Sequence, residues 1–290
     1  MIHTSKTQLG ILILPAFAVI LVFALFPVFW VLAHAFMDLD PATGAAAFAG
    51  LANFSDLFSD WFFMASIKTT VKFSLWASFF QVGLGLVLAL LFFRQFPGRR
   101  LALPLVIYPM MLSTLVASSI WRAWFHYDFG MLNHWLILAG LHPVKWLFDP
   151  DLALWAIVLV DVWQWTPMTF LIVLAGLQSI PKDILEAAVT DGASPFQRTF
   201  FVILPMIRGH VFLALLLRSI DTFRLFDKVY ALTGGGPGNA TETLSMFVYR
   251  HGFKFFEVGR ASAASVVMLA IACALSLVYA ARILKGQQTR

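Results

Sequence analysis

The chain has 290 residues, of which 60% are hydrophobic and 12% are charged, and its mean hydropathy is +0.84. Soluble domains are about one quarter charged and roughly half apolar, so this composition excludes an ordinary water-soluble enzyme and indicates a membrane protein. The formal net charge of +5 is then relevant to membrane topology and lipid headgroups rather than to nucleic acid.

The cysteine and histidine patterns give no sign of a catalytic or metal centre. Cys273 is the only cysteine, so no internal disulfide can form, and its place in an apolar run suits a small packing residue. The seven histidines are scattered, with no pair and no histidine–carboxylate set at ligand spacing. We therefore predict no catalytic residue, no metal site and no enzymatic activity in this chain.

Six long apolar segments follow one another, and we predict that each is a transmembrane helix. About 20 apolar residues cross a bilayer core of ~30 Å, and every segment reaches that length. The segments lack the short alternating pattern of a transmembrane β-barrel. The predicted fold is therefore all-α, a single transmembrane domain over residues 1–290. The predicted spans are about 9–36, 69–93, 101–125, 152–177, 201–221 and 261–282.

The distribution of Lys and Arg predicts which ends of the spans face the cytoplasm. The first loop, 37–65, contains no Lys or Arg, whereas the short loop 94–100 contains three Arg residues. This contrast places both the N-terminus and the 94–100 loop in the cytoplasm, and six spans return the C-terminus to the same side. The loop 222–260 argues against this topology because it carries five basic residues on the external side, but early short loops usually dominate orientation.

The connection 178–200, cytoplasmic in this topology, has the sequence of two short helices separated by a turn. Pro181 suits the first position of a helix, and Gly192 suits its C-terminal end. Ser194 and Pro195 then form an N-cap and a first helical position. We therefore expect two helices outside the membrane that meet close to Gly192.

Residues 186–205 carry a spacing pattern that connects this loop to a known family. Glu186, Ala187 and Ala188 are followed by three residues and Gly192, and nine residues later by the stretch 202–205, Val-Ile-Leu-Pro. The pattern resembles the EAA loop of ABC-importer membrane subunits, with valine here in place of an isoleucine. Small residues allow another backbone to approach closely, the carboxylate supplies a charged contact, and the glycine permits a sharp turn.

Three further segments, 127–133, 175–181 and 232–237, resemble the carbohydrate-uptake branch of the same family. By these segments the chain is similar to the first of the two permeases in maltose and glycerol-3-phosphate importers. It lacks the extra N-terminal helices and the large external domain of the maltose type. The resemblance implies a compact type I ABC importer permease fold with six helices, in the bacterial cytoplasmic (inner) membrane.

The resemblance also implies the partners. The chain contains no Gly-x-x-x-x-Gly-Lys-Ser/Thr loop to hold nucleotide phosphates, so no cofactor is expected on it, and ATP and Mg²⁺ would bind a separate ATPase. Two ATPase copies, a second permease and a periplasmic or extracellular solute-binding protein would complete the importer. The residues expected to couple to the ATPase are Glu186, Ala187, Ala188, Asp191 and Gly192.

Asp161 is an ionisable residue near the middle of the fourth predicted span. A charge at that depth costs about 2.5–3.5 kcal/mol on insertion scales, which favours a functional interpretation. Trp165 lies one helical turn further on, and Gln164 lies close to the same face. A carboxylate beside an aromatic ring suits the hydroxyl groups of a sugar or polyol. The alternative is that Asp161 pairs with Arg218 or Arg224 and joins two helices.

The family resemblance implies substrate contacts at these positions of the fourth span and in the outer half of the fifth span. Serines of the third span are further candidates, although serines in a span also bond backbone carbonyls or allow close helix packing. The predicted residues of the substrate pathway are Asp161, Gln164, Trp165, Asp221, Thr222, Arg224 and Ser118.

The sequence leaves two questions of function open. An ion-coupled secondary transporter would use Asp161 to bind a proton or sodium ion, but such carriers usually contain inverted repeats, and the two halves of this chain show no convincing similarity. For an importer, the substrate is a sugar, a polyol or a compound like glycerol 3-phosphate. Arg218 and Arg224 favour an anion, whereas Asp161 and Asp221 oppose one.

Overall fold

The computed structural model describes residues 6–39 and 45–288. Contacts between Cα atoms divide the chain into two compact units. The first unit contains Met1–Met64 and Phe247–Ile271, and the second contains Ala65–Met246 and Ala272–Arg290. Helices make up nearly all of the regular structure in the described residues, which agrees with the predicted all-α class.

Five helical stretches in the described part of the chain are long and apolar enough to cross a membrane, and a bent pair of shorter helices gives a sixth if the pair counts as one span. Each of the six predicted segments overlaps one of them. The second span begins at Trp61, earlier than the predicted residue 69. The stretches are Phe17–Ala35, Trp61–Phe93, Arg99–Met111 with Thr114–Trp124, Pro150–Gln178, Pro195–Phe223 and Val258–Tyr279.

The first unit begins with a helix, a β-hairpin and a short second helix: α1 (Lys6–Ala35), β1 (Met37–Leu39), β2 (Ala46–Phe48) and α2 (Ala52–Ser59). The two strands pair antiparallel. Asn53 Nδ2 donates hydrogen bonds to the carbonyl oxygens of Ala35, at 3.0 Å, and Met37, at 2.9 Å. These bonds satisfy carbonyl groups where α1 ends and the hairpin begins. An ion pair between Asp60 and Arg260 joins the two stretches of chain that form this unit.

Three helices contribute residues to both units: α3 (Trp61–Phe93), α12 (Leu244–Tyr249) and α13 (Val258–Gln288). A π-helical segment, Arg250–Lys254, lies between the last two. The remaining helices belong to the second unit: α4 (Arg99–Met111), α5 (Thr114–Trp124), α6 (Met131–Leu138), α7 (Pro150–Gln178), α8 (Lys182–Thr190), α9 (Pro195–Gln197), α10 (Leu204–Phe223) and α11 (Asp227–Leu232).

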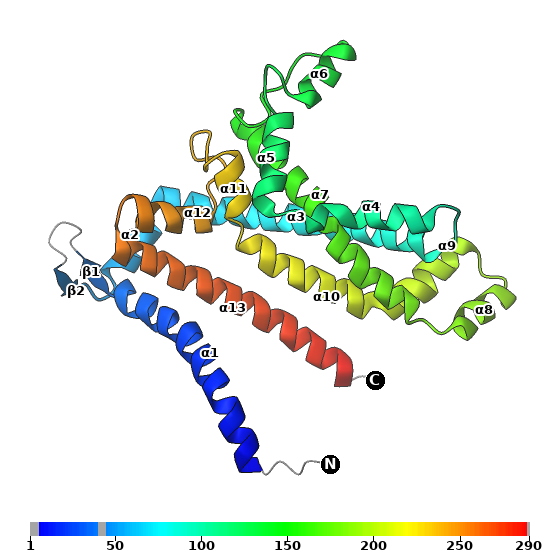
Figure 1. Cartoon of the computed structure of the whole chain (residues 1–290), viewed down its shortest axis with the longest axis horizontal. Coiled ribbons are helices and arrows are strands. Elements are labelled where there is room, and N and C mark those ends of the chain that lie inside the picture. The colour runs from blue at the N-terminus through cyan, green and yellow to red at the C-terminus, as the bar shows by residue number, and fades with distance from the viewer. Residues whose placement is uncertain (1–5, 40–44, 289–290) are drawn as a thin grey trace. The chain divides into compact units, whose positions relative to one another are not determined.

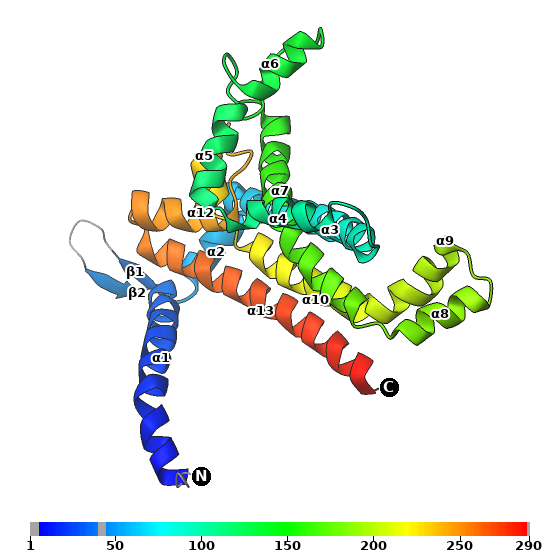
Figure 2. The same cartoon turned by 45° about the vertical axis from the view of Figure 1, so that its right-hand side comes forward.

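In the second unit, α7 is the central helix and packs against α4 and α10 (Figure 1). The apolar core includes Phe92, Phe170, Leu177 and Ile207, and the rings of Phe92 and Phe170 pack edge to face at 5.2 Å. The α8–α9 elbow (residues 182–197) and α6 lie at opposite ends of α7 (Figures 1 and 2). With 29 residues, α7 is long enough to cross a bilayer core of ~30 Å.

The third predicted span, 101–125, is not one continuous helix, so this prediction needs correction. Its two helices, α4 and α5, form a bent pair with an angle of 98°. Leu112 and Ser113 between them have extended backbone, with ψ of 140° at both. At this break, Gln164 Nε2 of α7 donates to the carbonyl oxygen of Leu112 at 2.9 Å and so supplies a hydrogen-bond partner for a backbone group where the helix ends. Hydropathy does not reveal such a break, because a bent segment can be as apolar as a straight one.

The α3 and α7 backbones approach closely at Gly85. A Cβ atom there would overlap Thr169 Oγ1 and lie 2.9 Å from the backbone nitrogen of Phe170. Thr169 Oγ1 itself donates to the carbonyl oxygen of Gln81 at 2.7 Å, so it is held in place and cannot simply move aside. A glycine is therefore required at this crossing of two helices.

We expect Gly85→Ala to lower the thermal unfolding temperature of the purified protein, because overpacking at a rigid contact costs about 1–3 kcal/mol. Gly83→Ala is the matched control, since it lies on the same helix and a Cβ there meets no atom within 4 Å. That control should be neutral or slightly stabilising. Equal unfolding temperatures for the two variants would contradict the close packing of α3 against α7.

Candidate functional site

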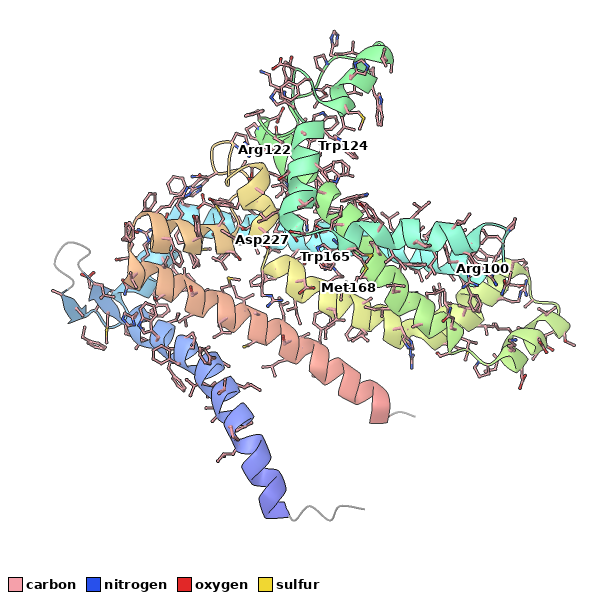
Figure 3. The ribbon with its side chains drawn as sticks, in the orientation of Figure 1. Arg100, Arg122, Trp124, Trp165, Met168 and Asp227 are labelled. Carbon is pink, nitrogen blue, oxygen red and sulfur yellow. The ribbon has the colours of Figure 1, made fainter. Side chains whose placement is uncertain are left out.

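A cavity of about 390 Å³ lies in the second unit, where α5, α7, α10 and α11 come together. Charged side chains dominate its lining. In Figure 3, Trp165 on α7 and Asp227 at the start of α11 both lie in this region. The lining residues are Thr114, Asp161, Trp165, Arg218, Asp221, Arg224, Leu225, Phe226, Asp227 and Lys228.

Helical spacing explains how these side chains reach one cavity. Asp161 and Trp165 are four residues apart on α7, and Arg218 and Asp221 are three apart on α10, so each pair shares a helix face. The chain then leaves α10 and begins α11, which lies beside α5 (Figure 1). This short helix packs against α5 and α7 and brings Lys228 to the same place.

Asp161 is the centre of a buried polar cluster. Its side chain is 3% exposed, and its Oδ1 accepts a hydrogen bond from Lys228 Nζ at 2.6 Å. Its Oδ2 accepts one from Gln81 Nε2 of α3 at 2.7 Å and lies 3.5 Å from Arg218 Nη2. Both carboxylate oxygens are therefore engaged, and one side chain connects α3, α7, α10 and α11.

Arg218 completes this cluster, and all three nitrogens of its guanidinium have a partner. Its Nε donates to Gln81 Oε1 at 2.7 Å, its Nη1 pairs with Asp221 Oδ2 at 3.3 Å, and its Nη2 pairs with Asp161. The side chain is 2% exposed. Moving a charge from water into the protein interior costs free energy. A buried guanidinium is therefore tolerated only when it is paired and hydrogen-bonded, as Arg218 is.

Trp165 is half-buried and lies against both buried cations. The Cζ atom of Arg218 is 5.1 Å from the centre of an indole ring, and Nζ of Lys228 is 5.8 Å from it. These are cation–π distances, so the two charges hold the indole in place at the wall of the cavity.

The structure brings four of the predicted pathway residues to the cavity, namely Asp161, Trp165, Asp221 and Arg224. The predicted alternative, in which Asp161 pairs across helices, is also present: Arg218 is one partner. Arg224 is not, because its Nη2 pairs with Asp221 at 3.0 Å.

The other three predicted pathway residues lie outside this cavity. Gln164 is buried against the break between α4 and α5. Thr222 Oγ1 faces α3, 2.7 Å from Ser74 Oγ, and Ser118 donates to the carbonyl oxygen of Thr114 within its own helix. Gln164 and Thr222 are each one residue from a lining residue, and a shift of one residue turns a side chain by about 100° around a helix.

Gln81 and Lys228 are the residues of this cluster that sequence reasoning missed. Gln81 is a single amide in an otherwise apolar stretch of α3, and such a residue in a span is a signal that could have found it. Lys228 was assigned to an external loop, 222–260, and only the tertiary position of α11 brings it to Asp161.

The elbow has the predicted form. Ser194 and Gln197 form a reciprocal capping box at the start of α9, and Gly192, with φ of +77°, ends the turn after α8. Pro181 precedes the first helical residue instead of occupying that position. Of the predicted coupling residues, Ala188 is partly buried, and the exposed ones are Glu186, Ala187, Asp191 and Gly192.

The elbow also exposes large apolar side chains to its surroundings. Val189 on α8 is 54% exposed and Phe196 on α9 is 66% exposed. No residue of α8 is buried.

Residues 81–286 match the family described as the binding-protein-dependent transport system inner membrane component. The chain belongs to this family. It is therefore a multi-pass membrane permease of the ABC importer type, as the pattern at 186–205 predicts.

Two relatives within the family match nearly the whole chain. The trehalose/maltose transport system permease protein MalF of Thermococcus litoralis is 37% identical over 278 residues, which cover 94% of this chain and 93% of the relative. The sn-glycerol-3-phosphate transport system permease protein UgpA of Yersinia pseudotuberculosis is 34% identical over 272 residues, covering 92% and 91%. Both relatives are transport permeases and not enzymes.

A solved structure supports the fold. The bacterial alginate ABC transporter, crystallised in complex with an alginate pentasaccharide-bound periplasmic protein, contains a chain that superposes with a TM-score of 0.84. The alignment covers 94% of this chain and 93% of that chain at 22% identity, so it bears on the fold alone.

Proposed function

We propose that this chain is one of the two permeases of an ATP-driven importer for a sugar, a polyol or a related compound, and that it forms half of the translocation pathway. The observation that carries this proposal is the 37% identity, over nearly the full length of both chains, to a permease named for trehalose and maltose. The relative named for sn-glycerol 3-phosphate keeps a phosphorylated polyol within the proposed class.

The proposed topology has six spans, with α4 and α5 counted as one, and places both termini in the cytoplasm. One transmembrane domain then comprises residues 1–290. The opposite positions of α6 and the elbow along α7 support this arrangement. The Arg residues of the loop 94–100 favour a cytoplasmic position for that loop, and the same topology places the elbow in the cytoplasm. The membrane is proposed to be the bacterial cytoplasmic membrane.

The elbow is proposed to dock on a separate ABC ATPase, which is present in two copies and holds ATP and Mg²⁺. The elbow exposes apolar side chains and the carboxylate of Glu186. These side chains support a protein partner, because an apolar patch exposed to water is unfavourable and commonly marks an interaction site. A second permease and an external solute-binding protein complete the proposed complex.

Uptake into proteoliposomes tests this proposal. The complete complex, reconstituted with its binding protein and without any ion gradient, is expected to accumulate a carbohydrate when ATP is supplied to the ATPase side. An ion-coupled carrier would stop under these conditions. Uptake that needs a gradient and ignores ATP would contradict the importer assignment.

A further inference from the structure

The charges that line the cavity form a buried set and an accessible set. Asp161, Arg218 and Lys228 are each 2–3% exposed and belong to the buried set. Asp221 is 38% exposed and Arg224 is 60% exposed, and the accessible set also includes Asp227, which is exposed at the start of α11. A bound molecule therefore meets two carboxylates and one guanidinium directly.

The two buried cations are poorly accessible to an anionic ligand, since each side chain is 2% exposed and already faces a carboxylate. Every nitrogen of the Arg218 guanidinium already has an oxygen partner within 3.5 Å. The ammonium of Lys228 is in contact with Asp161 at 2.6 Å and lies against the Trp165 ring. A phosphate would have to open this buried cluster and compete with the carboxylate of Asp161, which would then be buried with a weakened counter-charge.

The accessible charges oppose an anion as well. Arg224 is already paired with Asp221 at 3.0 Å, and Asp227 adds a second carboxylate to the same lining. An anion that approached this guanidinium would meet two negative charges and one positive charge, so the accessible set as a whole repels it.

What the cavity does offer is suited to hydroxyl groups. A carboxylate has about four acceptor positions, so Asp221 can accept further hydrogen bonds after its two contacts to arginines. Thr114 adds a hydroxyl, and Trp165 adds an aromatic wall that suits the C–H face of a sugar ring. Donors on the ligand would pair with acceptors on the protein, and no net ligand charge is needed.

We propose that this cavity takes a neutral, hydroxyl-rich molecule, such as a sugar or polyol, and discriminates against the phosphorylated or carboxylated counterpart. The inference rests on the proposed function, since it assigns the charge class of the substrate at the same site. Asp227 determines the specificity of the cavity by repelling an anionic ligand.

The first test measures uptake of matched pairs by the complete reconstituted complex with its binding protein. The pairs are trehalose with trehalose 6-phosphate, glucose with glucuronate, and glycerol with sn-glycerol 3-phosphate. The expected result is ATP-driven uptake of one or more neutral members and none of the charged members. Uptake of a charged member in preference to its neutral counterpart would overturn the inference, while still supporting an ATP-driven importer. An absence of all uptake by a complex that hydrolyses ATP would instead contradict the proposed carbohydrate class, and the inference with it.

The second test removes the binding protein, because its own selectivity could mask that of the cavity. Saturation-transfer NMR on the purified membrane complex compares the same pairs, with trehalose and trehalose 6-phosphate as the primary probes. We expect the charged probe to bind more weakly by about tenfold or more. Asp227→Asn should narrow this difference by improving binding of the charged probe alone. Equal or tighter binding of the charged probe to the unaltered complex would overturn the inference.

A matched control tests whether the effect of Asp227→Asn comes from its position in the cavity or from removing any acidic residue at the start of a helix. Asp151 is also an exposed acidic residue in the first turn of a helix, α7, and it does not line the cavity. Asp151→Asn is therefore expected to leave the discrimination between the probes unchanged. If both variants narrowed the difference to the same extent, the repulsion assigned to Asp227 would be wrong.

Discussion

Replacing Asp161 with leucine is expected to destabilise the protein severely, with a loss of about 3–5 kcal/mol, because Lys228 would remain buried without its counter-charge and Arg218 would keep only its 3.3 Å contact to Asp221. The variant also removes the acceptor for Gln81 Nε2. We expect less protein in the membrane, a lower thermal unfolding temperature for the purified complex, and loss of uptake. A variant as stable as the unaltered protein would show that this ionic cluster does not hold the four helices together.

The matched control replaces the whole cluster with apolar residues of similar size. A buried ionic network can often be exchanged in this way with little change in stability, because no partner is left unpaired. The combination Asp161→Leu, Gln81→Leu, Arg218→Met and Lys228→Met is therefore expected to restore the unfolding temperature. It should not restore uptake if these groups shape the pathway. Full uptake by the restored protein would limit the cluster to a structural role.

Replacing Gly192 with valine is expected to abolish ATP-driven uptake while the permease still inserts and folds. The φ of +77° at this position strains a β-branched residue, so the turn between α8 and α9 must change its shape. A Cβ there meets no atom within 4 Å, so the effect comes from the backbone and not from a clash. The measurements are uptake, ATPase activity of the complex, and retention of the ATPase during purification.

Gly140→Val provides the control for backbone strain. Gly140 has the same φ of +77° and the same open surroundings, but it follows α6 at the other end of α7. Both variants should lose a similar, small amount of stability, and only the elbow variant should lose its coupling to the ATPase. Equal loss of uptake in the two variants would mean that strain in general, and not the shape of the elbow, causes the defect.

Local signals in the sequence predicted the elbow well. Gly192, Ser194 and Pro195 each favour one local backbone conformation, and the structure has the turn at Gly192 and the N-cap at Ser194 where these residues predict them. The six apolar segments were equally clear, because a bilayer crossing needs a long apolar stretch that few other structures contain.

Features that depend on tertiary packing could not be predicted in this way. Gln81 and Lys228 reach Asp161 from positions 80 and 67 residues away in the sequence, and no local pattern encodes that meeting. The bend at Leu112 is stabilised by Gln164 of another helix. Arg224 was a reasonable partner for Asp161 by charge, but Asp221, three residues away on the same stretch of chain, pairs with it instead.

A cysteine placed on the elbow tests directly whether the elbow lies in the cytoplasm and is held by a separate ATPase. Val189, which is 54% exposed on α8, is changed to cysteine in a protein whose only native cysteine, Cys273, is replaced by serine. We expect this cysteine to crosslink to the ATPase subunit with a yield that changes on addition of ATP. We also expect that a membrane-impermeant thiol reagent does not reach it from outside intact cells. Labelling from the outside would contradict a cytoplasmic elbow, and full uptake by a complex without any ATPase would contradict its coupling role.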